Sequence, residues 1–189
     1  LRTNLKTLEL NKKFLDFPEI YINNNKIYIL IAVEENNCRE IKLYKAPFNL
    51  NMINFELLYT TKNNNKCVSS QNNIGRIQSI ELDNQTHILI SIGSDVHKAK
   101  DTEDENDYGN IIVINENIGN FEIYAKGLRS VLGLYADDEV ILATDNGPRG
   151  GDEINKIIRN RHYGWPYASY GEPDFIYYRE DPFYKKNHK

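Results

Sequence analysis

The sequence has no apolar run that approaches the roughly 20 consecutive residues needed for a membrane-spanning helix. Basic residues do not dominate its charge, because 23 Lys and Arg stand against 27 Asp and Glu and give a formal net charge of −4. Nucleic-acid binding depends on clustered basic side chains that face phosphates. We therefore expect a protein with no membrane span and no nucleic-acid partner.

Cysteine is also scarce. Cys38 and Cys67 belong to no CxxC pair, and no Cys/His cluster has the spacing of a zinc site. A disulfide between the two would fit an exported protein, but two separate free thiols are the interpretation that we favour. The chain starts at Leu1 without a signal peptide, which fits a mature domain as well as an internal fragment.

Helical periodicity is missing over any long segment, and only residues 153–159 are candidates for a short helical turn. Short runs of β-branched and aromatic residues take its place, separated by Asn, Asp and Gly. Asn runs at 23–25 and 63–65 suit turns, because Asn tolerates left-handed backbone angles. The nine clearest predicted strands are residues 26–33, 40–44, 55–60, 76–82, 87–92, 110–114, 121–124, 131–135 and 140–144.

Nine or more short strands predict an all-β fold, which is a sandwich, a barrel or a propeller. The strands group in fours, and residues 90–94 and 142–147 run from an apolar strand into a Gly-containing loop, as inner strands of propeller blades do. These features favour the propeller. Since the strands fill about three four-stranded blades and three blades cannot close a ring, we expect an incomplete ring: a single partial propeller domain over residues 1–189.

Residues 145–155 form the most site-like segment. Three glycines and a proline there impose an irregular backbone that can turn carbonyl oxygens toward a ligand. Asp145, Asp152 and Glu153 add hard oxygen donors, and calcium takes roughly six to eight of these. The spacing is not that of an EF-hand. An Asx-rich turn that caps a strand is the alternative interpretation.

Three sequence blocks carry a resemblance to a known family: Gly-Leu-Arg-Ser-Val-Leu-Gly-Leu at 127–134, Asp-Asn-Gly-Pro-Arg-Gly-Gly-Asp-Glu-Ile-Asn at 145–155, and His-Tyr-Gly-Trp-Pro at 162–166. Together they resemble the fingerprint of the glucose/sorbosone dehydrogenase family, whose members are soluble sugar dehydrogenases that use pyrroloquinoline quinone (PQQ). The resemblance extends over about residues 68–171 and is strongest in 127–171. It implies a six-bladed β-propeller, oxidation of an aldose sugar at C1, and a periplasmic or secreted location.

The resemblance also implies roles for individual residues. Arg129 would bind the carboxylates of PQQ, which suits a guanidinium fork. The backbone carbonyls of Gly147 and Pro148 would hold the calcium ion that polarises the quinone, and Asn146 would contact the cofactor. Glu153 and Tyr163 would hold a structural calcium ion.

Two departures from the family pattern leave the activity open. Asn72 occupies the position of the family's general base, a His, and an amide cannot accept a proton at neutral pH. Residues 130–132 read Ser-Val-Leu where the family has Asn-Pro-Gln. One hypothesis is therefore a PQQ-type sugar dehydrogenase that takes a small sugar, and the other is a catalytically impaired or non-enzymatic propeller that binds a ligand or partner. A lactonase-type propeller is disfavoured, because its acids would not stand in a Gly-Gly-Asp-Glu phrase.

Overall fold

The computed structural model describes residues 2–4, 13–35, 38–49, 51–61, 74–94, 107–148 and 150–170. Throughout these ranges the regular structure is β-strand, and no helix occurs in them. The strands are β1 (Arg2–Thr3), β2 (Lys13–Asn23), β3 (Lys26–Glu35), β4 (Cys38–Pro47), β5 (Met52–Ile53), β6 (Glu56–Thr60), β7 (Ile74–Leu82), β8 (Gln85–Ile92), β9 (Asn110–Asn115), β10 (Phe121–Lys126), β11 (Val131–Ala136), β12 (Ile141–Asp145) and β13 (Glu153–Lys156).

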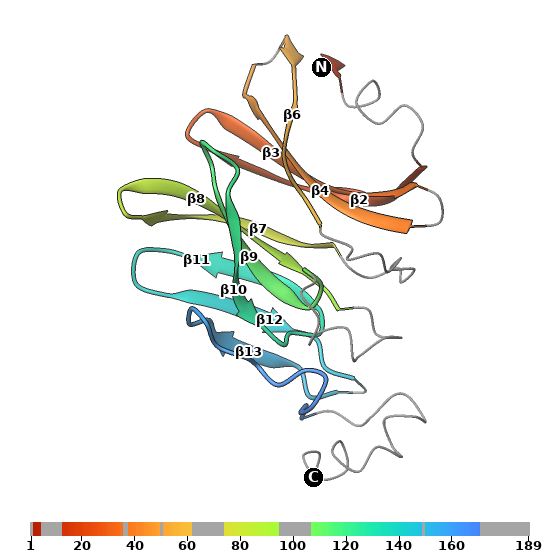
Figure 1. The fold of residues 1–189 in the computed structure, drawn as a ribbon, viewed down its shortest axis with the longest axis vertical. Coiled ribbons are helices and arrows are strands. Elements are labelled where there is room, and N and C mark those ends of the chain that lie inside the picture. The colour runs from red at the N-terminus through yellow and green to blue at the C-terminus, as the bar shows by residue number, and fades with distance from the viewer. Residues whose placement is uncertain are drawn as a thin grey trace.

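Three antiparallel sheets follow one another along the long axis of the molecule (Figure 1). The first has the strand order β2-β3-β4-β6, the second β10-β9-β8-β7 and the third β11-β12-β13. The short strands β1 and β5 form a separate parallel pair. Each sheet is built from strands nearly consecutive in the chain, which is typical of antiparallel pairing.

The sheets meet along their first strands. β2, β7 and β11 are each an edge strand of their own sheet, and β2 and β11 both pack against β7. The first strands therefore lie innermost. Residues 90–94 and 142–147, which the sequence predicts to end inner strands, end β8 and β12, the second strands of their sheets. The sequence pattern marks where a strand enters a loop but not the rank of that strand in its sheet.

The second sheet is buried on both faces. Ile88 and Ile90 of β8 pack in a cluster with the first sheet, whereas Leu89, between them, packs in a cluster with the third. In β9, Ile112 joins the first cluster and Ile111 the second. Successive side chains of a strand point to opposite faces, so a strand with two buried faces reads as a continuous apolar run. The Ile and Val runs of the sequence reflect this double burial.

All nine predicted strands are present, each extended or trimmed by a few residues at most. The helical turn predicted within 153–159 is wrong, because residues 153–156 form β13, which pairs with β12. β2 escaped prediction because Pro18 interrupts it. Proline has no N–H for a ladder and is confined to edge strands and bulges, and β2 is an edge strand with two register shifts.

Asparagine forms the tightest turns, as predicted. Asn24 and Asn25 join β2 to β3 with φ angles of 46° and 61°, and Asp83 and Asn84 join β7 to β8 with 53° and 58°. Two successive left-handed residues make the two-residue hairpin turn that matches strand twist. The second predicted Asn turn, at 63–65, lies outside the described residues.

Cys38, at the start of β4, is disulfide-bonded, so the preference for two free thiols is wrong. Sequence spacing cannot decide such a question, because disulfide formation depends on how close the fold brings two Cα atoms. The only other cysteine in the sequence, Cys67, lies outside the described residues.

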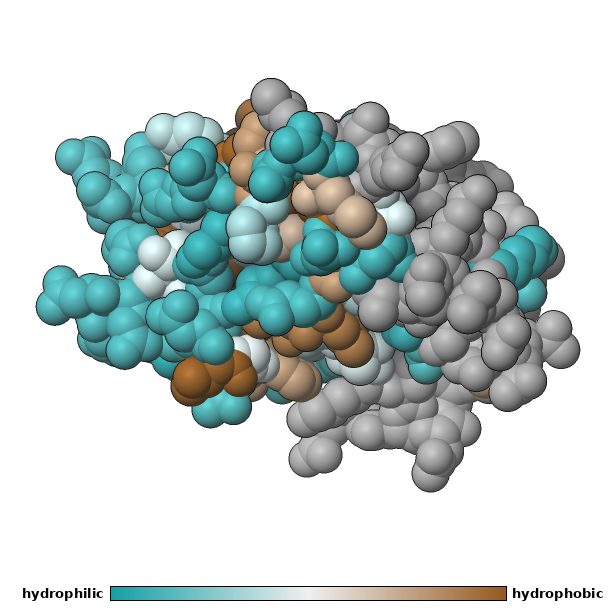
Figure 2. Space-filling model, turned by 90° about the horizontal axis from the view of Figure 1, so that it is seen from above, coloured by the Kyte–Doolittle hydropathy of each residue, from teal (hydrophilic) through white to brown (hydrophobic). Residues whose placement is uncertain are grey.

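The apolar surface is uneven. The end of the molecule formed by the first sheet is mainly hydrophilic, with hydrophobic residues in small separate groups (Figure 2). The face of the third sheet that points away from the second carries Tyr135, 52% exposed, and Ile154, 77% exposed. In the ranges that the structure describes, no other sheet packs against this face.

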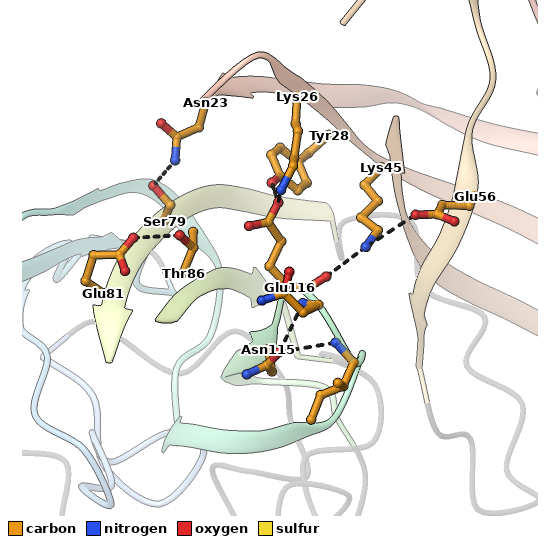
Figure 3. A network of polar contacts seen from close by, with 12 residues as sticks. Asn23, Lys26, Tyr28, Lys45, Glu56, Ser79, Glu81, Thr86, Asn115 and Glu116 are labelled. Atoms are coloured by element: carbon orange, nitrogen blue, oxygen red, sulfur yellow. Dashed lines mark hydrogen bonds and ion pairs between the residues drawn. The ribbon is translucent and has the colours of Figure 1, made fainter. Parts of the chain in front are cut away.

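A buried carboxylate ties the first sheet to the second (Figure 3). Glu116, in the turn between β9 and β10, accepts hydrogen bonds from Tyr28 Oη and, at 2.5 Å, from Lys26 Nζ, both on β3. Lys45 Nζ on β4 donates to the Glu116 main-chain oxygen at 2.8 Å. Burial raises the pKa of the Glu116 carboxyl, but the bonds from Lys26 and Tyr28 and the charges of Lys26 and Lys45 outweigh burial, and the pKa lies below its usual value.

We expect Glu116→Gln to lower the free energy of unfolding at pH 7 by about 1.5–3 kcal/mol, the contribution of hydrogen bonds to a charged group. The folded-state pKa of Glu116 lies below its unfolded value of about 4.3. The stabilisation is therefore complete above that pH and is lost as the pH falls through the folded pKa. Urea unfolding of both proteins at pH 7 and at pH 3 measures the difference.

Glu56→Gln is the matched control, because Glu56 contacts the same Lys45 at 3.3 Å but its side chain is 67% exposed. An exposed pair of this kind contributes at most about 1 kcal/mol. Equal losses in the two variants, or a deficit of Glu116→Gln that stays constant down to pH 3, would contradict this role of Glu116.

Candidate functional site

The segment that links β10 to β11 is held by both neighbouring sheets. Leu128 N donates to Gly109 O at 3.0 Å, and Ser94 N, just after β8, donates to Arg129 O at 2.8 Å. Gly127 begins the segment with a φ of 74°, and a Cβ there would lie 2.3 Å from the ring of His162. Only glycine combines that backbone angle with that close packing.

Asp145 ends β12 and is buried, and its carboxylate accepts two backbone hydrogen bonds. Arg129 N donates to Oδ2 at 2.8 Å and Ser130 N to Oδ1 at 2.6 Å. Burial raises the pKa of the Asp145 carboxyl; the two amide bonds oppose this, the nearby Glu153 charge adds to it, and the pKa ends above its usual value. Asp145 and Glu153 are directly opposite in the β12–β13 ladder, so two carboxylates share one small region.

The Arg129 side chain lies over the following loop. Its Nη1 donates to Asn146 O at 2.9 Å and to Asn146 Oδ1 at 3.0 Å. Its guanidinium carbon lies 5.5 Å from the centre of the Trp165 ring, in cation–π contact. Arg129 is therefore fixed by its backbone, by an amide and by an aromatic face.

The loop after β12 closes on itself through Asp152 and glycine. Asp152 Oδ1 accepts hydrogen bonds from Asn146 Nδ2 at 2.9 Å and from Gly147 N at 3.0 Å. A Cβ on Gly147 would lie 2.4 Å from Gly150 O and 2.5 Å from Gly151 O, so these two carbonyl oxygens press against the Gly147 Cα. Asp152 thus caps a backbone amide within the loop, but the amide precedes it in the chain, whereas an Asx turn bonds the amide two residues on.

The chain after β13 returns to the edge of β10 and brings Trp165 to the site. Tyr163 N donates to Lys126 O at 2.8 Å and Trp165 N to Gly127 O at 2.9 Å. His162 rests on Gly127 and accepts a hydrogen bond from Gly164 N at Nδ1. Partial burial and the charge of Lys126 hold the pKa of His162 below its usual value.

The Tyr163 hydroxyl has two main-chain partners: it donates to Lys156 O at 2.6 Å and accepts from Ile158 N at 2.8 Å. Because the phenol serves the fold in this way, any contact of Tyr163 with a metal ion falls to its main-chain carbonyl. Glu153 accepts a hydrogen bond from Asn155 Nδ2 at 3.0 Å through Oε2.

A cavity of about 10 Å³ lies at the centre of these contacts. That volume is about the minimum for one water molecule, so the cavity suits an ion or a water rather than an organic molecule. Two carboxylates, a guanidinium, a serine and an aromatic ring gather around it. The lining residues are Arg129, Asp145, Gly147, Pro148, Glu153, Tyr163, Trp165, Ala168 and Ser169.

Two larger cavities, of about 180 and 270 Å³, lie toward the hairpin turns at the opposite end of the strands. The first is lined by turn residues that include Asp137, and the second by turn residues that include Asp83. Neither combines buried charges with a fixed loop, so the small cavity is the better candidate for a functional site. Within the described part of the chain, no three His, Cys, Asp or Glu side chains are grouped to hold a metal ion.

The structure brings together five of the seven residues to which the family resemblance assigns a role. Arg129, Gly147, Pro148, Glu153 and Tyr163 all line the cavity. Asn146 lies beside it, with its side chain between Arg129 and Asp152. Asn72 lies outside the described residues. Sequence reasoning missed the contact of Trp165 with Arg129 and the amide bonds of Asp145, since no local signal records a contact between distant segments.

No helix in the described ranges is long and apolar enough to cross a membrane.

The fold is similar to that of solved sugar dehydrogenases. The apo soluble aldose sugar dehydrogenase of Escherichia coli superposes with a TM-score of 0.64 at 19% identity, over 79% of this chain and 47% of that one. The PQQ-bound aldose sugar dehydrogenase of Streptomyces coelicolor gives 0.56 at 17% identity, over 78% and 45%. The chain thus spans about half the length of these neighbours.

Sequence relatives match over shorter stretches. An uncharacterized protein of Synechocystis is 40% identical over 53 residues, which are 27% of this chain and 13% of that protein. The aldose sugar dehydrogenase YliI of Escherichia coli is 37% identical over 60 residues, which are 31% and 16% of the two chains. The sequence profile of the glucose/sorbosone dehydrogenase family matches residues 16–188. Since that match spans most of the 189 residues, the chain belongs to the glucose/sorbosone dehydrogenase family.

Proposed function

We propose that this chain forms three blades of a six-bladed propeller that acts as a PQQ-dependent aldose sugar dehydrogenase. The observation that carries the proposal is the pairing of a fixed guanidinium, Arg129, with an ion-sized cavity lined by Asp145 and Glu153. An anion-binding group beside a cation site suits a cofactor that carries carboxylates and is bound together with a metal ion. The family membership and the fold give this pairing its chemical context.

Calcium fits the cavity. Its donors are hard oxygens: the carboxylates of Asp145 and Glu153, and the carbonyls of a loop in which Gly147 leaves no room for a side chain. The raised pKa of Asp145, caused by burial and the Glu153 charge, marks a region where a cation would relieve repulsion. The family resemblance assigns these residues to two calcium ions, but in this fold they line one ion-sized cavity, and we therefore propose a single ion. The carboxylates of Asp145 and Glu153 and the main-chain carbonyls of Gly147, Pro148 and Tyr163 would hold it.

The described part of the chain supplies one group that would recognise PQQ, Arg129, and no pocket that would enclose the cofactor. Pockets for organic ligands measure roughly 300–1,000 Å³, far more than the cavity beside Arg129. The remaining walls would come from other blades of the ring. PQQ would supply the electron acceptor for oxidation of the sugar at C1, and calcium would supply a Lewis acid beside it. Arg129, stacked on Trp165 and fixed by Asn146, would hold a carboxylate of the cofactor.

Three blades and an open ring accord with the arrangement of the sheets. The sheets meet along their first strands. The face of the third sheet that points away from the second exposes Tyr135 and Ile154, as expected of a surface that packs against a fourth blade. The chain spans about half the length of its solved neighbours, and this share supports three blades of six. We infer one partial propeller domain over residues 1–189.

Export to the periplasm or outside the cell is supported by the disulfide at Cys38, since disulfides persist in oxidising compartments.

A member of the family that does not oxidise sugars is the second candidate. Asn72 stands at the family's base position and cannot take the proton, which removes a contribution of roughly 10²–10⁴-fold. Asn146 also engages Arg129 Nη1 with its side chain, which leaves that N–H group bonded within the protein. Under this second candidate function, the same loops bind a ligand or partner and catalyse no reaction.

Calcium should raise the melting temperature of the chain, because it binds only the folded state. At 100 times its dissociation constant the ion adds about 2.7 kcal/mol, or about 5–10 °C for a chain of this size. Differential scanning fluorimetry in calcium and in chelator measures the shift. Glu153→Gln should abolish it, and Glu139→Gln, an exposed acid in the β11–β12 turn, should not. Identical melting curves in calcium and chelator would remove the metal from the proposal.

Arg129→Ala should weaken PQQ binding, in the presence of calcium, by about 1.5–3 kcal/mol, the scale of charge-assisted hydrogen bonds. Arg159→Ala is the control, since Arg159 pairs with Glu122 away from the cavity. Isothermal titration measures binding, and a dye-coupled assay with glucose measures oxidation. While Asn72 is present we expect little oxidation, a residual rate roughly 10²–10⁴-fold below that of an enzyme with the base. Turnover at the rate of an ordinary dehydrogenase would contradict the role assigned to Asn72, and absence of PQQ binding would favour the second candidate.

A further inference from the structure

Asp145 lies between two features that are otherwise separate. On one side its carboxylate holds the backbone amides of Arg129 and Ser130, at 2.8 and 2.6 Å. On the other side Asp145 lines the cavity together with Glu153. A carboxylate has about four lone-pair positions, and the two amides occupy two of them. One side chain can therefore serve the backbone and an ion at the same time.

The backbone that Asp145 holds is the one that carries Arg129. Asn146 N donates to Ser130 O at 3.0 Å, and Ser94 N donates to Arg129 O, so the two residues are held through both their N–H and C=O groups. Asp145 accepts a hydrogen bond from both N–H groups. If the carboxylate shifts, the Arg129 and Ser130 amides lose their acceptor on β12, and the backbone that carries the guanidinium stacked on Trp165 is held less firmly.

A comparison within the chain separates this role from simple turn capping. Asp137 Oδ1 accepts two backbone amides, from Glu139 and Val140, in the exposed turn between β11 and β12. A carboxylate can therefore cap two backbone amides while it is exposed to solvent. Asp145 makes the same pair of bonds while buried, opposite a second carboxylate, although burial of a charge is costly. Capping alone does not require such a location.

We propose that Asp145 is a positioning residue that couples the cation cavity to Arg129. An ion in the cavity fixes the Asp145 carboxylate, and the carboxylate, through its two amide bonds, orders the backbone of Arg129 and Ser130. Cation binding thereby prepares the guanidinium for an anionic ligand. The inference rests on the proposed cation site, and it adds a route by which that site acts on Arg129.

Amide hydrogen exchange of the full chain, followed by NMR or mass spectrometry with calcium chloride as the probe, tests the coupling. Calcium should slow exchange of the Arg129 and Ser130 amides by about 5- to 150-fold, the usual range of coupling between sites. The Glu139 and Val140 amides, held by Asp137, should exchange at the same rate with and without calcium.

Three variants sharpen the test. Glu153→Gln should remove the calcium-dependent protection and leave Asp145 in place. In Asp145→Asn, calcium should no longer slow exchange of the Arg129 and Ser130 amides together, because the NH₂ group of the new side chain would face one of the two N–H donors. Asp137→Asn should leave the protection at Arg129 and Ser130 unchanged.

The outcomes distinguish the coupling from the cation site itself. If calcium raises the melting temperature and the Arg129 and Ser130 amides exchange at unchanged rates, the coupling is wrong and the cation site stands. If calcium changes neither, both are wrong. Since the wild-type measurement needs no variant, a failure of Asp145→Asn to fold leaves the test intact.

Discussion

Burial of the second sheet on both faces is the constraint on which the rest of the structure depends. Ile88 and Ile112 point toward the first sheet and Leu89 and Ile111 toward the third, so the two neighbours are fixed against one central layer. Hydrophobic burial of this kind is non-directional, and the alternation of side chains along each strand gives it direction. The stacking sets which loop ends meet, and therefore where the site forms.

Backbone groups rather than a cluster of side chains build the site. Ser94 N and Gly109 O of the second sheet hold the segment before β11, and the Asp145 carboxylate of the third sheet holds the same segment from the other side. Glycines at 127 and 147 allow the close approaches. The arrangement leaves a cavity with oxygen donors and a stacked guanidinium at its margin, which is a suitable environment for a metal ion next to an anion.

The sequence predicted most of the strands, because the buried strands are β-branched runs whose period is visible locally. Composition alone marked the loop at 145–155, which contains Gly147, Pro148 and Glu153. Only the resemblance to a family added Arg129 and Tyr163, because they are distant from that loop in the chain. Contacts between sheets had no local signal: the amide bonds of Asp145 and the stacking of Arg129 on Trp165 follow from the fold. The strand β13 was misread as a helical turn, because a four-residue Glu-Ile-Asn-Lys segment takes its conformation from β12.

The central claim is that the cavity between Asp145 and Glu153 holds a calcium ion that organises the loop around Arg129. A crystal structure of the chain grown in calcium, with diffraction data collected at long wavelength, tests it most directly. The account predicts an anomalous peak inside this cavity, within about 2.3–2.6 Å of carboxylate and carbonyl oxygens. A peak elsewhere, or a cavity that holds only water at saturating calcium, would contradict it.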